Sequence, residues 1–115
     1  MAERVPENVR LFLEAHIESV EQLEALLLLR DERARAWTAA EVSRRLRGSS
    51  EAMRFRLGSL ATHGLLERSG ETFTYVATES EERRVGEVAR CFRVRRTAVI
   101  AAIFAAEAGI AEQST

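Results

Sequence analysis

The side chains with the clearest chemical potential are arginines near the middle of the chain. Residues 44–68 carry six arginines and two glutamates, whereas residues 1–32 carry three arginines and eight acidic residues. A guanidinium group can donate paired hydrogen bonds to a phosphate or to the O6 and N7 atoms of guanine. The sequence contains no lysine, so part of this enrichment reflects a general use of arginine. The cluster favours contact with a nucleic acid over an ordinary solvated helix face.

Other kinds of chemistry find little support in the sequence. The two histidines, His16 and His63, are far apart, and the single cysteine, Cys91, has apolar neighbours and no second cysteine to pair with. We find no metal-ligand spacing, no glycine-rich phosphate loop and no nucleophile motif. We therefore expect no metal, no cofactor and no enzymatic activity.

The length and composition suit a single domain spanning residues 1–115. Of the 115 residues 46% are hydrophobic, which is enough apolar material for one core. The formal net charge is −1. The charged N-terminal sequence lacks the pattern of a secretory signal. The longest uncharged run, residues 97–106, is shorter than the ~20 apolar residues that a membrane span needs. We expect a cytoplasmic protein that does not enter a membrane.

The elements that position the arginines follow from apolar spacing and capping signals. These signals predict four helices. The first begins at Pro6, and the other three cover about 20–32, 39–47 and 51–63. Gly48 is expected to end the third of these with a positive φ, and Ser49 or Ser50 to cap the fourth.

The second half of the chain predicts a hairpin and a long helix. Residues 65–68 and 72–77 are expected to be strands, with a turn at 69–71 between them, and Arg35–Trp37 a short stub of strand. Apolar residues then recur every three or four positions over about 80–106, which predicts one long helix. The arginines of this last segment are expected to form its polar side.

The helix expected at 51–63 has two distinct faces. At ~100° per residue, Met53, Leu57 and Leu60 fall on one side, which must be the buried one. Phe55 falls on the opposite side, near Glu51, Gly58, Ser59 and Thr62, while Arg54 and Arg56 flank it. The exposed ring could cover a thymine methyl, fill a pocket on a protein partner, or fold beneath the hairpin.

Three spaced stretches resemble bacterial winged helix-turn-helix regulators of the MarR/ArsR type. They are Trp37–Leu46 (WTAAEVSRRL), Leu57–Leu60 (LGSL) and His63–Arg68 (HGLLER). The resemblance covers about residues 19–78 and implies a mainly α protein with a small β-hairpin, a winged helix-turn-helix with additional N- and C-terminal helices. It also implies a transcriptional regulator that binds double-stranded DNA, with helix 51–63 in the major groove and the 65–77 hairpin on the backbone.

This interpretation assigns two sets of DNA contacts. Base contacts are expected from the outward face of helix 51–63, and phosphate contacts from residues around it. The first set is Arg54, Phe55, Arg56 and Ser59; the second is Arg44, Arg47, Ser49, Ser50 and Arg68.

The terminal helices suggest a partner. In the family that the chain resembles they commonly form a homodimer, which would place the 51–63 helices of the two subunits ~34 Å apart, one turn of DNA. The alternative is that they close the protein's own core. A second hypothesis for the whole chain is a non-catalytic module that binds another protein, because the net charge is near neutral and Phe55 is aromatic.

Overall fold

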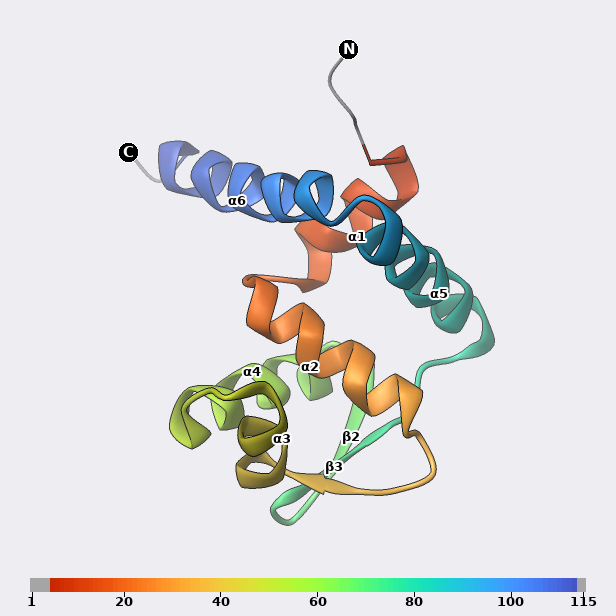
Figure 1. Ribbon diagram of the computed structural model, residues 1–115, viewed down its shortest axis with the longest axis vertical. Coiled ribbons are helices and arrows are strands. Elements are labelled where there is room, and N and C mark those ends of the chain that lie inside the picture. The colour runs from red at the N-terminus through yellow and green to blue at the C-terminus, as the bar shows by residue number, and fades with distance from the viewer. Residues whose placement is uncertain (1–4, 114–115) are drawn as a thin grey trace. The chain divides into compact units, whose positions relative to one another are not determined.

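The computed structural model describes residues 5–113, with side chains as far as residue 105 (Figure 1). Within that part the chain forms six helices and three short strands: α1 (Glu7–His16), α2 (Val20–Asp31), β1 (Trp37–Thr38), α3 (Ala39–Leu46), α4 (Ser50–Thr62), β2 (Leu66–Ser69), β3 (Thr72–Tyr75), α5 (Glu79–Val94) and α6 (Arg96–Gln113). The prediction of a mainly helical protein with a small hairpin is confirmed. The chain divides into a central unit, Glu21–Glu81, and a terminal unit made of the segments before and after it.

The sheet of the central unit is antiparallel and has the strand order β1-β3-β2. The hairpin turn uses Gly70, whose φ of +60° suits a residue without a side chain. Along β3 the residues alternate between half-buried and buried positions, as the period of two in Thr72–Tyr75 predicts. The strand stub predicted at Arg35–Trp37 lies slightly later, at Trp37–Thr38, where Trp37 pairs with Phe73.

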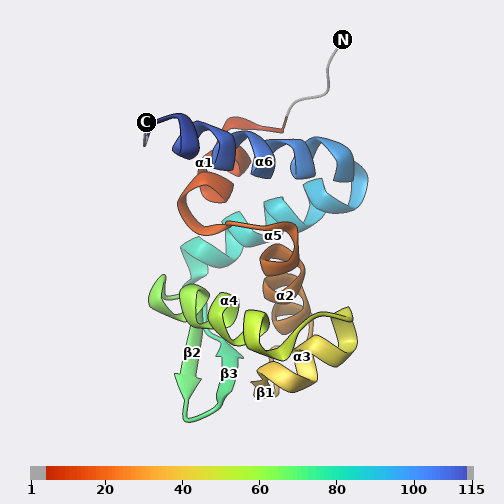
Figure 2. The same ribbon diagram turned by 90° about the vertical axis from the view of Figure 1, so that its left-hand side faces the viewer.

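The helices of the central unit pack around apolar side chains that are fully buried. Figure 2 shows α3 and α4 beside the hairpin, and both α3 and β2 contact α4. The largest buried apolar side chains of this unit are Leu23, Leu26, Leu29, Trp37, Met53, Leu57, Leu60, Leu65 and Phe73. Because three of these belong to α4, the rotation of α4 about its own axis is fixed by the core.

Local signals set the ends of the helices in this unit. Thr38 and Glu41 form a capping box at the start of α3, and Thr78 and Glu81 make the same reciprocal hydrogen bonds at the start of α5. Gly64 follows the end of α4 and has a positive φ, +82°. The expectation for Gly48 is wrong by one residue.

The reason lies in where α3 stops. The helix ends at Leu46, so Arg47 takes the left-handed conformation with φ +60°. The backbone N–H of Gly48 then donates to the carbonyl of Ser43 at 3.0 Å, which satisfies one of the last free carbonyl groups of the helix.

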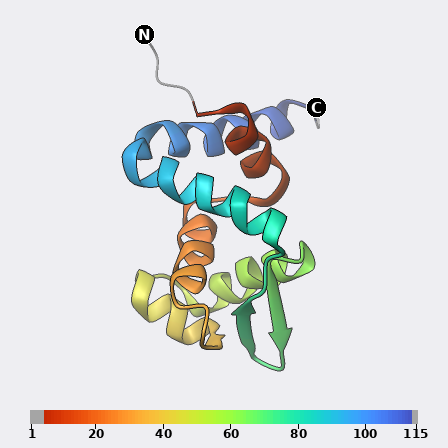
Figure 3. The ribbon, with the colours of Figure 1, turned by 90° about the vertical axis from the view of Figure 1, so that its right-hand side faces the viewer.

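The terminal unit consists of α1, α5 and α6, and it corrects one prediction. The segment 80–106 is two helices rather than one long helix, with a break at Arg95 (Figure 3). Val88 and Phe92 before the break, and Val99 and Ile103 after it, are all buried. A change of direction between the two sets lets both reach the interior, and their spacing alone does not reveal it. Val94, next to the break, is exposed.

Candidate nucleic-acid interface

Helix α4 is anchored on one side and open on the other. Met53, Leu57 and Leu60 have no exposed surface, and the side-chain amide of Gln22 donates to the carbonyl of Arg56 at 3.2 Å. These contacts hold the helix to the core of the central unit. The residues opposite to them therefore face outward, as helical spacing predicts.

The start of α4 is exposed and offers hydrogen-bond donors. Ser49 caps the helix, and its Oγ accepts a hydrogen bond from the backbone N–H of Ala52 at 3.4 Å. Its hydroxyl hydrogen remains able to donate to another group. Ser50 is the first residue of the helix and is also exposed. A helix N-terminus with free N–H groups and hydroxyls next to it is chemically suited to a phosphate oxygen.

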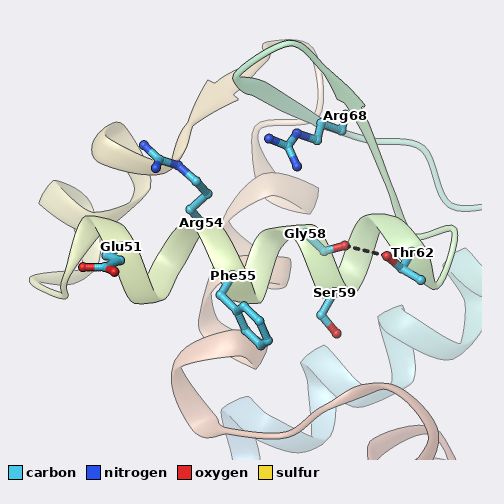
Figure 4. Close-up of a pocket in the computed structure, with 7 residues that line it drawn as sticks. All are labelled: Glu51, Arg54, Phe55, Gly58, Ser59, Thr62 and Arg68. Atoms are coloured by element: carbon cyan, nitrogen blue, oxygen red, sulfur yellow. Dashed lines mark hydrogen bonds between the residues drawn. The ribbon is translucent and has the colours of Figure 1, made fainter.

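A hollow of about 480 Å³ runs along the outward side of α4. Six residues of α4 and one of β2 line it: Glu51, Arg54, Phe55, Gly58, Ser59, Thr62 and Arg68. Figure 4 shows the long side chains of Arg54 and Arg68 on one side of the helix and Phe55 and Ser59 on the other. The hollow thus has a guanidinium side and an aromatic side. From here on we call it the α4 hollow.

Phe55 projects into solvent. Its exposed fraction is 76%, far more than that of any phenylalanine in the cores described above. The ring therefore does not fold beneath the hairpin, which removes one of the three interpretations of this residue. A large apolar side chain exposed at the centre of a helix face usually marks a contact with another molecule.

Three of the arginines assigned to the interface are unengaged. Among the described residues, the side chains of Arg44, Arg47 and Arg54 make no hydrogen bond, ion pair or ring contact, and all three residues are exposed. An arginine with no internal partner keeps all five N–H donors for an external acceptor. Arg44 belongs to α3 and Arg47 follows it, so both stand next to the exposed start of α4.

Arg68 is held in place by the hairpin. It lies opposite Phe73 in the sheet, its guanidinium carbon is 5.6 Å from the centre of that ring, and its Nε donates to the carbonyl of Gly70 at 3.1 Å. Neither contact uses the terminal nitrogen atoms. The hairpin therefore presents these donors at a fixed position beside α4.

Arg56 is placed differently from the other residues assigned to base contact. Only 27% of its side chain is exposed, and its Nη1 lies 3.2 Å from Oε2 of Glu21. It does not line the α4 hollow, so the structure brings together Arg54, Phe55, Ser59 and Arg68 without it. Arg45 is similarly engaged, by Glu32 at 2.7 Å and by the ring of Trp37.

Comparisons with protein-family models, curated proteins and solved structures give no match for this chain. Within residues 5–113 no helix has both the length and the apolar character needed to cross a membrane. In the same part of the chain no three His, Cys, Asp or Glu side chains come together where they could hold a metal ion.

Two residues that line the α4 hollow, Gly58 and Thr62, were not among the DNA contacts predicted from the sequence. The hydroxyl of Thr62 donates to the carbonyl of Gly58 at 3.0 Å. Helical spacing had placed both on the outward face, which was the available signal. A glycine inside a helix is costly enough to need a reason.

Proposed function

We propose that this chain is a transcriptional regulator whose central unit is a winged helix and binds double-stranded DNA. The observation that carries the proposal is the α4 hollow, where an unengaged arginine and an exposed aromatic ring share one helix face beside a β-hairpin. Two short helices joined by a brief turn, with the second one exposed, are the arrangement that places a helix in the major groove. That groove is ~12 Å wide and accepts an α-helix with its side chains.

The contacts divide by chemistry into two groups. Arg54, Phe55 and Ser59 face the base edges, because they occupy the outward face of α4. Phosphate contacts come from the residues around that face: Arg44, Arg47, Ser49, Ser50 and Arg68. Arg56 is left out of the first group because Glu21 engages its guanidinium group.

A salt-titrated binding assay tests this proposal. Wild-type protein should bind duplexes with an affinity that falls steeply with salt, since each phosphate contact releases counterions. Arg54→Ala should cost about 1–3 kcal/mol on a preferred sequence and relax the preference, whereas Arg47→Ala should weaken all sequences alike and reduce the salt slope by about one. Arg90→Ala is the matched control, because Arg90 is an exposed arginine of α5 that does not line the α4 hollow. Duplex affinity that does not respond to salt would refute the proposal.

The regulator is also proposed to be a homodimer formed through its terminal helices. Residues 97–105 of α6 contain no charge, yet Ala101, Phe104 and Ala105 are exposed, and Leu11 of α1 is half exposed. Such a helix, apolar on its solvent side as well as on its buried side, usually has a partner. A hollow between α1 and α6 is lined by four alanines of α6 on one side and by Val5, Glu7 and Arg10 on the other.

A second candidate is a winged-helix module that binds protein. The exposure of Phe55 favours it, since exposed aromatic rings are frequent anchors at protein interfaces. Two results would favour this second candidate over the regulator. The wild-type protein would bind no duplex, and Phe55→Ala would abolish capture of the protein partner.

A further inference from the structure

The aromatic side of the α4 hollow has a chemistry of its own. Phe55 and Gly58 are three residues apart on α4, so their Cβ positions lie about 5–6 Å apart on one face. Nothing stands above Gly58: a Cβ atom built there would meet no atom within 4 Å. A bare stretch of backbone therefore lies one turn along α4 from Phe55, between the exposed ring and the guanidinium side of the hollow (Figure 4).

This bare stretch offers almost no hydrogen bonds to a ligand. The carbonyl of Gly58 already accepts from Thr62, which also uses the hydroxyl hydrogen of Thr62. A group placed between the ring and the backbone of Gly58 would thus meet mostly carbon. The surface is suited to a small apolar group that approaches the helix closely.

The charges around the bare stretch argue against a protein as the occupant. Among the described residues that line the α4 hollow, Phe55 is the sole large apolar side chain. The hot spots of protein interfaces usually sit in apolar surroundings that exclude water. Here the neighbours are two guanidinium groups, of Arg54 and Arg68, and one carboxylate, of Glu51. An isolated apolar spot next to the unengaged Arg54 and the terminal donors of Arg68 matches the major groove, in which one apolar group stands among polar base edges.

That apolar group is the C5-methyl of thymine. We infer that Phe55 and the bare backbone at Gly58 receive a thymine methyl, beside a guanine whose O6 and N7 accept from Arg54. The inference rests on the proposed function and extends it, because it names the base that this part of the helix selects. Phe55 and Gly58 are then specificity-determining residues, and Arg54 supplies the neighbouring base contact.

The experiment removes the methyl group and nothing else. A preferred sequence is first enriched from random 24-base-pair duplexes with the wild-type protein. Each thymine of that sequence is then replaced singly by uracil, which keeps every hydrogen-bonding atom and lacks the C5-methyl. Fluorescence anisotropy at fixed salt compares wild type, Phe55→Ala and the control Val94→Ala, in which an equally exposed apolar side chain on another helix is shortened.

The inference expects a defined pattern. One thymine-to-uracil change should weaken wild-type and Val94→Ala binding by about fourfold, the value of one buried carbon group. Phe55→Ala should bind the thymine duplex more weakly and no longer distinguish it from the uracil duplex.

Three results would overturn the inference. The enriched sequence could lack thymine, no uracil change could alter the affinity, or Phe55→Ala could discriminate as well as the wild type. In each case salt-dependent, sequence-specific binding would still support the proposed function. Failure to enrich or bind any duplex would instead refute the proposed function, and Phe55 would then be assigned to a protein partner.

Discussion

Replacing Gly58 by alanine should change stability and binding in opposite directions. Glycine inside a helix costs about 1 kcal/mol relative to alanine, because it leaves the unfolded chain more freedom. At Gly58 the added Cβ meets no atom within 4 Å, and no positive φ is involved, so no packing or strain penalty offsets the gain. Gly58→Ala should therefore stabilise the fold by about 1 kcal/mol, a rise of about 4 °C in Tm for a domain of this size.

The same methyl should weaken binding to DNA. It fills the space above the backbone that we assign to a thymine methyl, and inserting a methyl group into a well-packed contact costs about 1–3 kcal/mol. Thermal unfolding followed by circular dichroism gives the first quantity, and anisotropy on the enriched duplex gives the second. If Gly58 served folding alone, its replacement by alanine would not raise Tm and at the same time lower the affinity for the duplex.

Gly70→Ala is the contrasting control for this variant. A Cβ at Gly70 also meets nothing within 4 Å, but its φ of +60° strains any other residue, so this change should lower Tm. A fall in Tm for Gly58→Ala would refute the claim of open space above the helix. Unchanged duplex affinity would show that no part of the DNA comes close to this backbone.

Two further predictions concern the capping box and the homodimer. The pKa of Glu41 is lowered, first by the backbone hydrogen bond from Thr38, so its stabilising effect is present above about pH 4.3 and is lost as the pH falls further. Urea midpoints of wild type and Glu41→Gln should therefore differ at pH 7 and converge at low pH, with Glu71→Gln as a control; a constant difference would contradict this. Phe104→Arg replaces a 60% exposed ring on α6 with a charged side chain and should halve the mass measured by light scattering, whereas Val94→Arg should not. A wild type with the mass of one chain would refute the dimer.

The sequence was sufficient where local chemistry decides the structure. Thr38 and Glu41 can satisfy each other's backbone groups without help from the rest of the chain, so the start of α3 was predictable. The inner face of α4 was predictable too, because Met53, Leu57 and Leu60 recur with the helical period. Its outward face, including Phe55 and Gly58, followed by exclusion.

The sequence was insufficient where a choice depends on packing. The break at Arg95 involves neither glycine nor proline, and the apolar period continues through it. Phe92 before the break and Val99 after it are both buried, so the packing of the assembled unit, and not the local sequence, accompanies the break. The shift of the positive φ from Gly48 to Arg47 is similar, since it depends on which residue ends α3.

The two arginines that flank the outward face of α4 show what this limit means for function. By spacing alone Arg54 and Arg56 are equivalent, because they lie on opposite flanks of Phe55. A residue far away in the sequence separates them: Glu21 on α2 engages Arg56, while Arg54 has no partner among the described residues. A base contact by Arg56 would first have to break that pair and would gain correspondingly less. The proposed interface thus depends on one reading arginine, so the loss of sequence preference should follow the Arg54→Ala variant far more closely than the Arg56→Ala variant.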